Sequence, residues 1–271
     1  MSGLGAWSAS AYEAFHDLRL RPALDLLARV PDPPEGDIVD LGCGAGAAAP
    51  ALRARFPGRL LIGVDGSADM LARADGLFDG TREADIAAWA PTRPPALIFS
   101  NAALHWLDDH ERLFPRLFAA LAPGGVLAVQ MPDQLCRPSH TSMIAAAAGV
   151  RPDLFTGWTP FPGPRPLPDY AALLPGAEID LWASEYMQRL DAREGHPVRA
   201  FTSSTGGRPV LARLDEAEAA RFNALWDAAL ERAYPRLADG SCWFPFRRVF
   251  LVARRADQSS RRPIRAGSED Q

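Results

Sequence analysis

The feature that most constrains the fold is a short apolar segment that runs directly into a glycine-rich turn. Residues 37–41 read Asp-Ile-Val-Asp-Leu and predict a buried strand, and Gly42, Gly44 and Gly46 lie in the turn that follows. The small residues over 47–56 then predict a helix. Glycine lets a backbone adopt positive φ and approach a ligand closely, and a helix start presents N–H groups without an intrahelical partner. This order of elements is typical of a nucleotide-binding site in an α/β fold.

The alternation of strand and helix continues through the first half of the chain. The expected elements are a strand at 60–64, a helix at 68–74, a brief edge strand before Asp85, a strand at 96–100, a helix at 108–122 and a strand at 126–131. Upstream of the glycine turn, Pro22 is expected to divide the helical pattern of residues 11–30 into two short helices. Strands that alternate with helices predict an α/β, Rossmann-like fold, with a mostly parallel sheet and helices on both faces.

The composition of the sequence changes after Pro132. Residues 151–168 are rich in Pro, Gly and aromatic residues and predict a long binding loop or a disordered segment. The later elements are expected as a helical stretch around 145–148, a strand at 177–190, a helix at 215–232 and a strand at 246–254. We expect one domain over 1–255, in which 132–215 forms a helical and loop cap over the ligand site, and a disordered tail over 256–271.

Composition narrows the classes of function. A net charge of -4 over 271 residues argues against a nucleic-acid-binding surface, which is normally basic. Three scattered cysteines, Cys43, Cys136 and Cys242, favour a reducing compartment over a disulfide framework. The sequence shows no signal peptide, no apolar stretch long enough to span a membrane and no histidines grouped at the spacing of a metal site. We expect a cytoplasmic protein that acts on a small molecule; the sequence does not indicate its oligomeric state.

The charge of the glycine turn narrows the choice of ligand. Asp40 precedes the first glycine by two positions, and the third glycine comes one position earlier than in the dinucleotide pattern G-x-G-x-x-G. A carboxylate at this place would repel a pyrophosphate and suits a cationic ligand. S-adenosylmethionine carries an ammonium and a sulfonium and no phosphate. Cys43 is interpreted as a small buried residue of the turn and not as a nucleophile.

Two further acids follow expected strands. Asp65, with Gly66 beside it, ends the second strand, where a carboxylate binds ribose hydroxyls in related folds. Asp85 is placed to accept a hydrogen bond from the adenine amino group, and Ile86 to pack on the adenine ring. The alternatives are that Asp65 only caps the next helix and that Asp85 is only a turn residue. The combination of both acids with the glycine turn favours an adenosyl cofactor.

Several stretches of the chain resemble a known family. Residues 40–46, Val64-Asp65 and 84–86 resemble class I S-adenosylmethionine-dependent methyltransferases. More specific likeness is carried by the stretches 19–23, 26–31, 100–107, 127–133, 205–209 and 250–255. These are similar to the trans-aconitate 2-methyltransferase family over almost the whole chain, with a departure at 151–175. The resemblance implies a class I methyltransferase fold, S-adenosylmethionine as cofactor and methyl transfer to one carboxylate of trans-aconitate or a similar small polycarboxylic acid.

Three residues are candidates for the acceptor side of such a site. A carboxylate acceptor needs no general base because its pKa lies well below 7. Arg208, after a Gly-Gly pair, is expected to hold a carboxylate of the acceptor, and the alternative is a surface arginine. Asn101 ends a strand at the edge of the sheet where ligands bind. His105 is expected to orient the acceptor; as a general base it would instead serve a hydroxyl or amine acceptor, which is the alternative function.

The remaining candidates surround the cofactor. Trp106 is expected to pack near the adenine or the acceptor, and Tyr12 and Arg19 to close over the cofactor from the N-terminal side. Core packing is the alternative for Trp106 and Tyr12, and a solvated helix face for Arg19. A nicotinamide-dependent enzyme and a cofactor-binding protein without catalysis are competing classes, and the glycine spacing and Asp40 argue against nicotinamide.

Overall fold

The strands of the chain assemble into one mixed sheet. The computed structural model describes residues 16–257, with side chains from Leu20 onward. Tyr12 and residues 258–271 of the expected tail lie outside this range. The seven strands lie in the order β3-β2-β1-β4-β5-β7-β6. They are β1 (Ile38–Leu41), β2 (Leu61–Asp65), β3 (Gly80–Glu83), β4 (Leu97–Asn101), β5 (Val126–Pro132), β6 (Glu178–Leu190) and β7 (Cys242–Arg254). Neighbours from β3 to β5 pair in parallel, whereas β7 is antiparallel to both β5 and β6.

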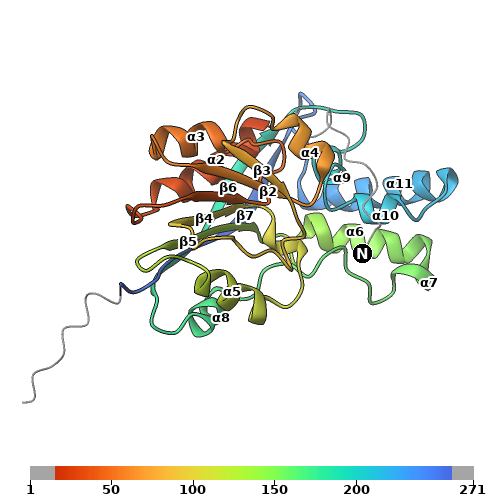
Figure 1. Ribbon diagram of the computed structural model, residues 1–271. Coiled ribbons are helices and arrows are strands. Elements are labelled where there is room, and N and C mark those ends of the chain that lie inside the picture. The colour runs from red at the N-terminus through yellow and green to blue at the C-terminus, as the bar shows by residue number, and fades with distance from the viewer. Residues whose placement is uncertain (1–15, 258–271) are drawn as a thin grey trace, which may run out of the picture.

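Helices cover both faces of this sheet, as the sequence predicts. Those described are α2 (His16–Ala28), α3 (Ala49–Arg55), α4 (Ala68–Arg73), α5 (His110–Ala119), α6 (Pro138–Val150), α7 (Pro152–Phe155), α8 (Leu167–Leu173), α9 (Pro197–Ser203), α10 (Arg208–Leu211), α11 (Glu216–Ala233) and the 3₁₀ turn η1 (Leu104–Trp106). Figure 1 shows α2 and α3 on one face and α5 and α8 on the other. Successive residues of β5 alternate between the two cores, so Val126 packs with the α2 side and Leu127 with the α5 side. No helix in the described range is long and apolar enough to cross a membrane.

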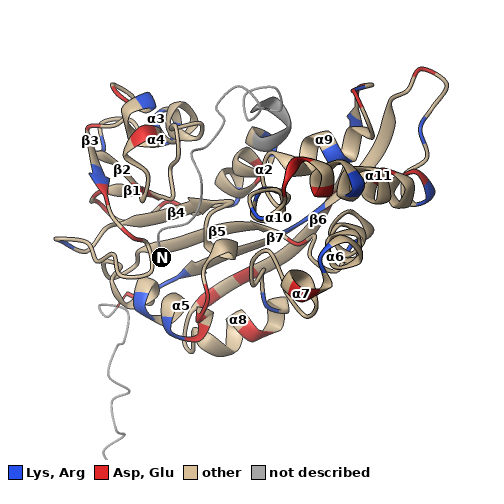
Figure 2. Ribbon diagram, turned by 90° about the vertical axis from the view of Figure 1, so that its right-hand side faces the viewer, with Lys and Arg blue, Asp and Glu red and all other residues tan. Residues whose placement is uncertain are grey.

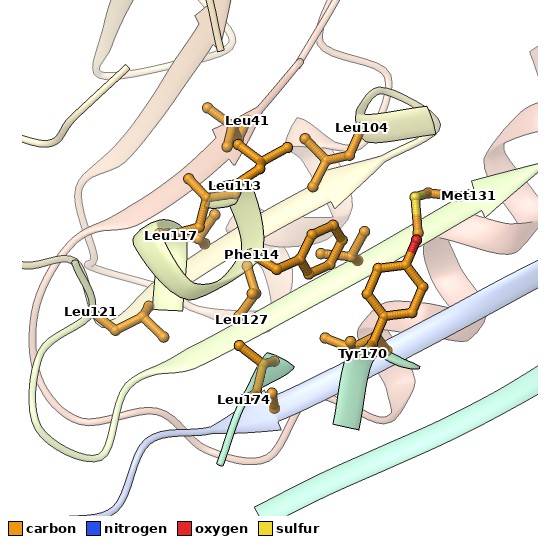
Figure 3. Close-up of a cluster of buried hydrophobic side chains, with 14 of the residues drawn as sticks. Leu41, Leu104, Leu113, Phe114, Leu117, Leu121, Leu127, Met131, Tyr170 and Leu174 are labelled. Atoms are coloured by element: carbon orange, nitrogen blue, oxygen red, sulfur yellow. The ribbon is translucent and has the colours of Figure 1, made fainter. Parts of the chain in front are cut away.

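The core beneath α5 also holds the end of the Pro-rich segment. Phe114 of α5 and Tyr170 of α8 are fully buried, with ring centroids 4.5 Å apart (Figure 3). The Tyr170 hydroxyl lies 2.8 Å from Nδ1 of His110 and accepts a hydrogen bond from the backbone N–H of Arg165. The segment over 151–168 therefore contains the short helix α7. Near its end, Arg165 is linked to His110 of α5 through the Tyr170 hydroxyl.

The parallel strands bring their carboxyl ends to one edge of the sheet. Leu41 of β1 pairs with Val64 of β2, and Asn101 of β4 pairs with Gln130 of β5. Directly after β4 the backbone takes a φ of +55° at Ala102, which is uncommon for a residue other than glycine. Its N–H donates to the carbonyl of Gln130, so the chain turns away from the sheet at this point. Such strained positions are concentrated at functional sites.

A third core lies beyond this edge, between helices and the outer halves of β6 and β7. It includes Met143 of α6, Phe201 of α9, Val210 of α10 and Trp226 of α11, each at most 2% exposed. Figure 1 shows α6, α7, α9, α10 and α11 gathered on this side, and Figure 2 shows acidic and basic segments interspersed along α9 and α11. The added helical region thus includes α11, which lies past the expected boundary of the cap at residue 215.

The expected division of the N-terminal helix at Pro22 is wrong. Helix α2 runs through Pro22 without interruption. A proline inside a helix removes one hydrogen bond and costs about 3 kcal/mol. Ala23, Leu26 and Leu27 pack into the core on the sheet and are at most 7% exposed. Their burial holds the helix against the sheet on the C-terminal side of the proline and offsets this cost.

Candidate active site

The glycine turn after β1 is built on backbone conformations that favour glycine. Gly42, Gly44 and Gly46 have φ values of +78°, +53° and +81°. A Cβ at Gly42 would lie 2.2 Å from Cβ of Ala103, in the segment that follows β4. No side chain fits at this point without displacement of its neighbour. The turn therefore requires glycine both for its backbone angle and for its contact with Ala103.

Asp65 at the end of β2 holds the turn in place. One of its carboxylate oxygens accepts a hydrogen bond from the N–H of Gly44 at 2.8 Å, and the other accepts from the N–H of Ser67 at 2.9 Å. Ser67, and not Asp65, caps α4, because its side chain accepts from the N–H of Met70. Asp65 thus links the glycine turn to the end of β2, with the exposed Gly66 next to it. Its binding of ribose hydroxyls stays a prediction.

Ile86 lies beside the glycine turn, and Asp85 lies at the surface next to it. Cδ1 of Ile86 is 3.2 Å from the Cβ position at Gly42. Asp85 is exposed, and its Oδ1 accepts a hydrogen bond from the N–H of Ala87. This bond is the one that a turn residue makes, and the carboxylate keeps further acceptor sites. Contact with adenine stays a prediction for both residues.

Asp40 is a carboxyl group buried beneath the turn. It is 2% exposed, and burial raises its pKa from 3.8 to about 7, with a smaller contribution from the negative charge of Asp65. A cationic ligand at the turn would favour the ionised form and lower this pKa. The ammonium and sulfonium of S-adenosylmethionine fit this requirement. Burial also raises the pKa of the Cys43 thiol, with Asp40 and Asp65 adding to the effect, so Cys43 is not an activated nucleophile.

A cavity of about 80 Å³ lies at the same edge of the sheet, next to the segment that follows β4. It is lined by Asn101, Ala102, His105, Trp106, Pro132, His140, Phe161, Phe201, Thr202, Thr205, Gly206, Phe246 and Arg248. Three of the predicted site residues, Asn101, His105 and Trp106, therefore meet in one cavity. Oδ1 of Asn101 is buried and has no hydrogen-bond partner among the described residues. Phe161 of the Pro-rich segment also belongs to this lining.

His105 is a neutral ring in the wall of this cavity. It is 4% exposed, and its ring lies 5.0 Å from Trp106 and 5.5 Å from Phe161 between centroids. Burial lowers the pKa of His105 to about 3, and the positive charge of Arg248 acts in the same direction. Its Nδ1 is buried without a hydrogen-bond partner in the range 16–257. An imidazole with so low a pKa is poorly suited to take up a proton at neutral pH.

The arginine in the cavity is not the one that the sequence favoured. Arg208 begins α10, is half-buried and is absent from the cavity lining, although Thr205 and Gly206 just before it belong to that lining. Arg248 of β7 lines the cavity instead and is 3% exposed. A signal for it was present in the sequence, because it is a charge within a strand of largely apolar residues.

Two other cavity residues, His140 and Thr202, have no sequence signal of this kind, because α6 and α9 approach the site only in the folded chain. Two predicted residues cannot be placed against the site. Tyr12 lies outside the described residues, and Arg19 belongs to α2 without a described side chain. Their contacts with the cofactor stay predictions.

Comparison with known proteins identifies the class to which the chain belongs. A family described as a methyltransferase domain matches residues 12–174. Among solved structures, phosphoethanolamine N-methyltransferase 2 of Haemonchus contortus in complex with S-adenosyl-L-methionine superposes with a TM-score of 0.53 at 19% identity, over 91% of this chain and 56% of that one. The chain is a class I S-adenosylmethionine-dependent methyltransferase, and S-adenosylmethionine is its cofactor.

Curated relatives narrow the class to one family. The trans-aconitate 2-methyltransferase of Methylobacterium nodulans is 42% identical over 92% of this chain and 98% of its own length. That of Paracidovorax citrulli is 41% identical over 92% and 98%. The chain belongs to the trans-aconitate 2-methyltransferase family.

Proposed function

We propose that the enzyme transfers the methyl group of S-adenosylmethionine to one carboxylate of trans-aconitate or of a similar small polycarboxylic acid. The observation that carries the proposal is the cavity beside the glycine turn, which contains a buried arginine and histidines that burial keeps neutral. A guanidinium pairs well with carboxylates. The names of the relatives support the same acceptor.

Methyl transfer to a carboxylate can take place in a cavity that lacks a general base. When bound, S-adenosylmethionine supplies a methyl group on a positively charged sulfur. An ionised carboxylate has no proton to lose, so the protein has to orient its oxygen, exclude water and balance charge. Asn101 orients the acceptor with its amide, and Trp106 and Phe161 exclude water with their rings, 4.9 Å apart between centroids. His105 acts as a neutral hydrogen-bonding group in this arrangement.

The alternative acceptor, a hydroxyl or amine, would need His105 to remove a proton. The low pKa of His105 weighs against this function, because its protonated form is strongly disfavoured in the buried site.

A panel of acceptors tests the proposal. The purified enzyme is incubated with methyl-labelled S-adenosylmethionine and trans-aconitate, other small di- and tricarboxylic acids, a phenol and an amine. We expect labelled methyl esters of polycarboxylic acids and no product from the phenol or amine. Turnover of the phenol or amine alone would reject carboxylate methylation, and calorimetry that shows binding of NAD but not of S-adenosylhomocysteine would reject the cofactor as well.

A substitution at His105 separates its two roles. His105→Gln keeps a neutral hydrogen-bonding side chain, so we expect the turnover rate with trans-aconitate to stay within about tenfold of the unchanged enzyme. Loss of a general base would instead lower the rate by about 10²–10⁴-fold. The measurement is kcat at saturating acceptor. A loss in this larger range, with unchanged binding of S-adenosylhomocysteine, would favour the base.

A further inference from the structure

Arg248 is a buried cation at the edge of the acceptor cavity. In the sheet it lies opposite Pro132 of β5 and Ser184 of β6, and it is followed by the buried apolar run 249–253. Only 3% of the residue is exposed. A buried charge is tolerated where hydrogen bonds and opposite charges compensate its desolvation. A guanidinium that forms part of a cavity wall is therefore well placed to bind an anion that enters the cavity.

Two neighbours fix the orientation of this guanidinium. Nη1 of Arg248 donates a hydrogen bond to Oε1 of Gln130 at 3.2 Å, and its Cζ lies 4.5 Å from the ring centroid of Phe246. Gln130 is itself fully buried on β5. Because Oε1 accepts from Arg248, the amide orientation of Gln130 is determined and its Nε2 is the free donor. That Nε2 is buried and has no hydrogen-bond partner in the described part of the chain.

Further donors surround the cavity. Oγ1 of Thr202 is buried without a hydrogen-bond partner among residues 16–257, and Thr202 lines the cavity. None of the described lining residues is acidic, so an anionic ligand meets no like charge on this wall. A guanidinium, an amide N–H and a hydroxyl match the several lone pairs of a carboxylate. Because a buried donor without a partner is costly, a carboxylate that accepts from Nε2 of Gln130 and Oγ1 of Thr202 would satisfy both groups.

Part of the cavity lining is close in sequence to the glycine-turn contact. Asn101 and Ala102 belong to the lining, and the next residue, Ala103, lies against Gly42 of the glycine turn. We propose that Arg248, oriented by Gln130, binds the acceptor carboxylate that is not methylated, so that a second carboxylate of the same molecule is left free for methylation beside Asn101. This assignment rests on the proposed function for the chemistry of the acceptor. It makes Arg248 a determinant of specificity for acids with two or more carboxylates.

The test compares two acceptors in two enzymes. The value of kcat/KM is measured for trans-aconitate and for crotonate, an unsaturated acid with one carboxylate, in the unchanged enzyme and in Arg248→Met. We expect Arg248→Met to lower kcat/KM for trans-aconitate at least a hundredfold, to change that for crotonate less than fivefold and to leave the affinity for S-adenosylhomocysteine unchanged. General damage to the fold would lower kcat/KM for both acceptors together. Loss of the carboxylate anchor, which is the contact of Arg248 with the unmethylated carboxylate, would lower kcat/KM for trans-aconitate only.

Two matched variants complete the test. Arg247→Met is the control: Arg247 is the neighbouring residue on β7, and its Nε binds Oδ2 of Asp133 at 2.8 Å, outside the cavity lining. It should leave the preference for trans-aconitate unchanged. Gln130→Glu keeps the side-chain shape and places a carboxylate beside Arg248 within the protein. It should lower kcat/KM for trans-aconitate at least tenfold, and it provides a second test if Arg248→Met does not fold.

The outcomes are distinguishable. If the unchanged enzyme methylates no carboxylic acid, both the proposed function and the anchor are rejected. If it methylates trans-aconitate and the preference survives in Arg248→Met, or survives in Gln130→Glu, only the anchor is rejected. Loss of the preference in Arg208→Met, with Arg248→Met unaffected, would assign the role to Arg208 instead.

Discussion

Gly42→Ala is expected to lower the affinity for S-adenosylhomocysteine at least tenfold and the free energy of unfolding by about 2–5 kcal/mol. The added methyl group meets two obstacles. The φ of +78° is unfavourable for alanine, and its Cβ would lie 2.2 Å from Cβ of Ala103. Either the glycine turn or the segment that begins with Ala102 has to move. The first change disturbs the proposed cofactor site, and the second disturbs the cavity that is proposed to bind the acceptor.

Gly58→Ala is the matched control for this prediction. Gly58 has nearly the same φ, +76°, but nothing lies within 4 Å of its Cβ position. Backbone strain should lower the free energy of unfolding of Gly58→Ala by only about 1–2 kcal/mol, and this variant should bind the cofactor normally. Denaturant unfolding and calorimetry with S-adenosylhomocysteine measure both effects. If the two substitutions changed stability and cofactor affinity equally, the contact between residue 42 and Ala103 would not contribute to the effect of Gly42→Ala.

The elements around the glycine turn could be predicted from the sequence because they are local. Strand β1, the glycine turn and the following helix are adjacent in the chain, and the charge of Asp40 is visible there. The remaining residues follow from a topological rule. Parallel strands end at one edge of the sheet, so Asp65 and Asn101 had to lie near the turn.

The lining of the cavity could be predicted only in part, because it depends on contacts between distant segments. Thr202 reaches the cavity because α9 packs in the third core, a packing that no local pattern specifies. Arg208 and Arg248 both had plausible patterns: one follows two glycines and the other interrupts an apolar strand. The antiparallel pairing of β7 with β5 determines that Arg248 lines the cavity, since it places Arg248 opposite Pro132, another lining residue.

Helix α2 illustrates the same limit. Local propensity predicts an interruption at Pro22, and burial of Leu26 against the sheet overrides it.

The buried carboxyl of Asp40 is expected to link cofactor binding to stability. The folded, ligand-free protein keeps the proton on Asp40 up to about pH 7, whereas the unfolded chain releases it near 3.8. The folded state therefore binds more protons between these values, and stability falls as pH rises through this window. The shift corresponds to a cost on the order of 4 kcal/mol above about pH 7. A cation bound next to Asp40 would remove this cost, so we expect the carboxyl group that destabilises the empty protein to contribute to cofactor binding.

Asp40→Asn should consequently stabilise the empty enzyme and weaken cofactor binding. The amide carries no charge to desolvate, so we expect ligand-free Asp40→Asn to gain on the order of 1–4 kcal/mol above about pH 7 and to show no loss of stability between the two pKa values. Its affinity for S-adenosylmethionine should fall about 10- to 100-fold, because a hydrogen bond or ion pair to a charged group is lost. Thermal unfolding across this pH range, with and without S-adenosylmethionine, measures both quantities.

Asp37→Asn gives the contrasting result from the same strand region. Asp37 accepts two hydrogen bonds from Arg93, at 2.6 and 2.8 Å, so its substitution removes a favourable pair. Because Arg93 is largely exposed, the expected loss is about 1 kcal/mol, with unchanged cofactor affinity. Opposite changes in stability from these two Asp→Asn substitutions, three positions apart, would indicate that the Asp40 carboxylate serves to bind a ligand and not to stabilise the fold. If Asp40→Asn destabilised the empty protein as Asp37→Asn does, Asp40 would have a structural role, and its proposed interaction with the cationic cofactor would be rejected.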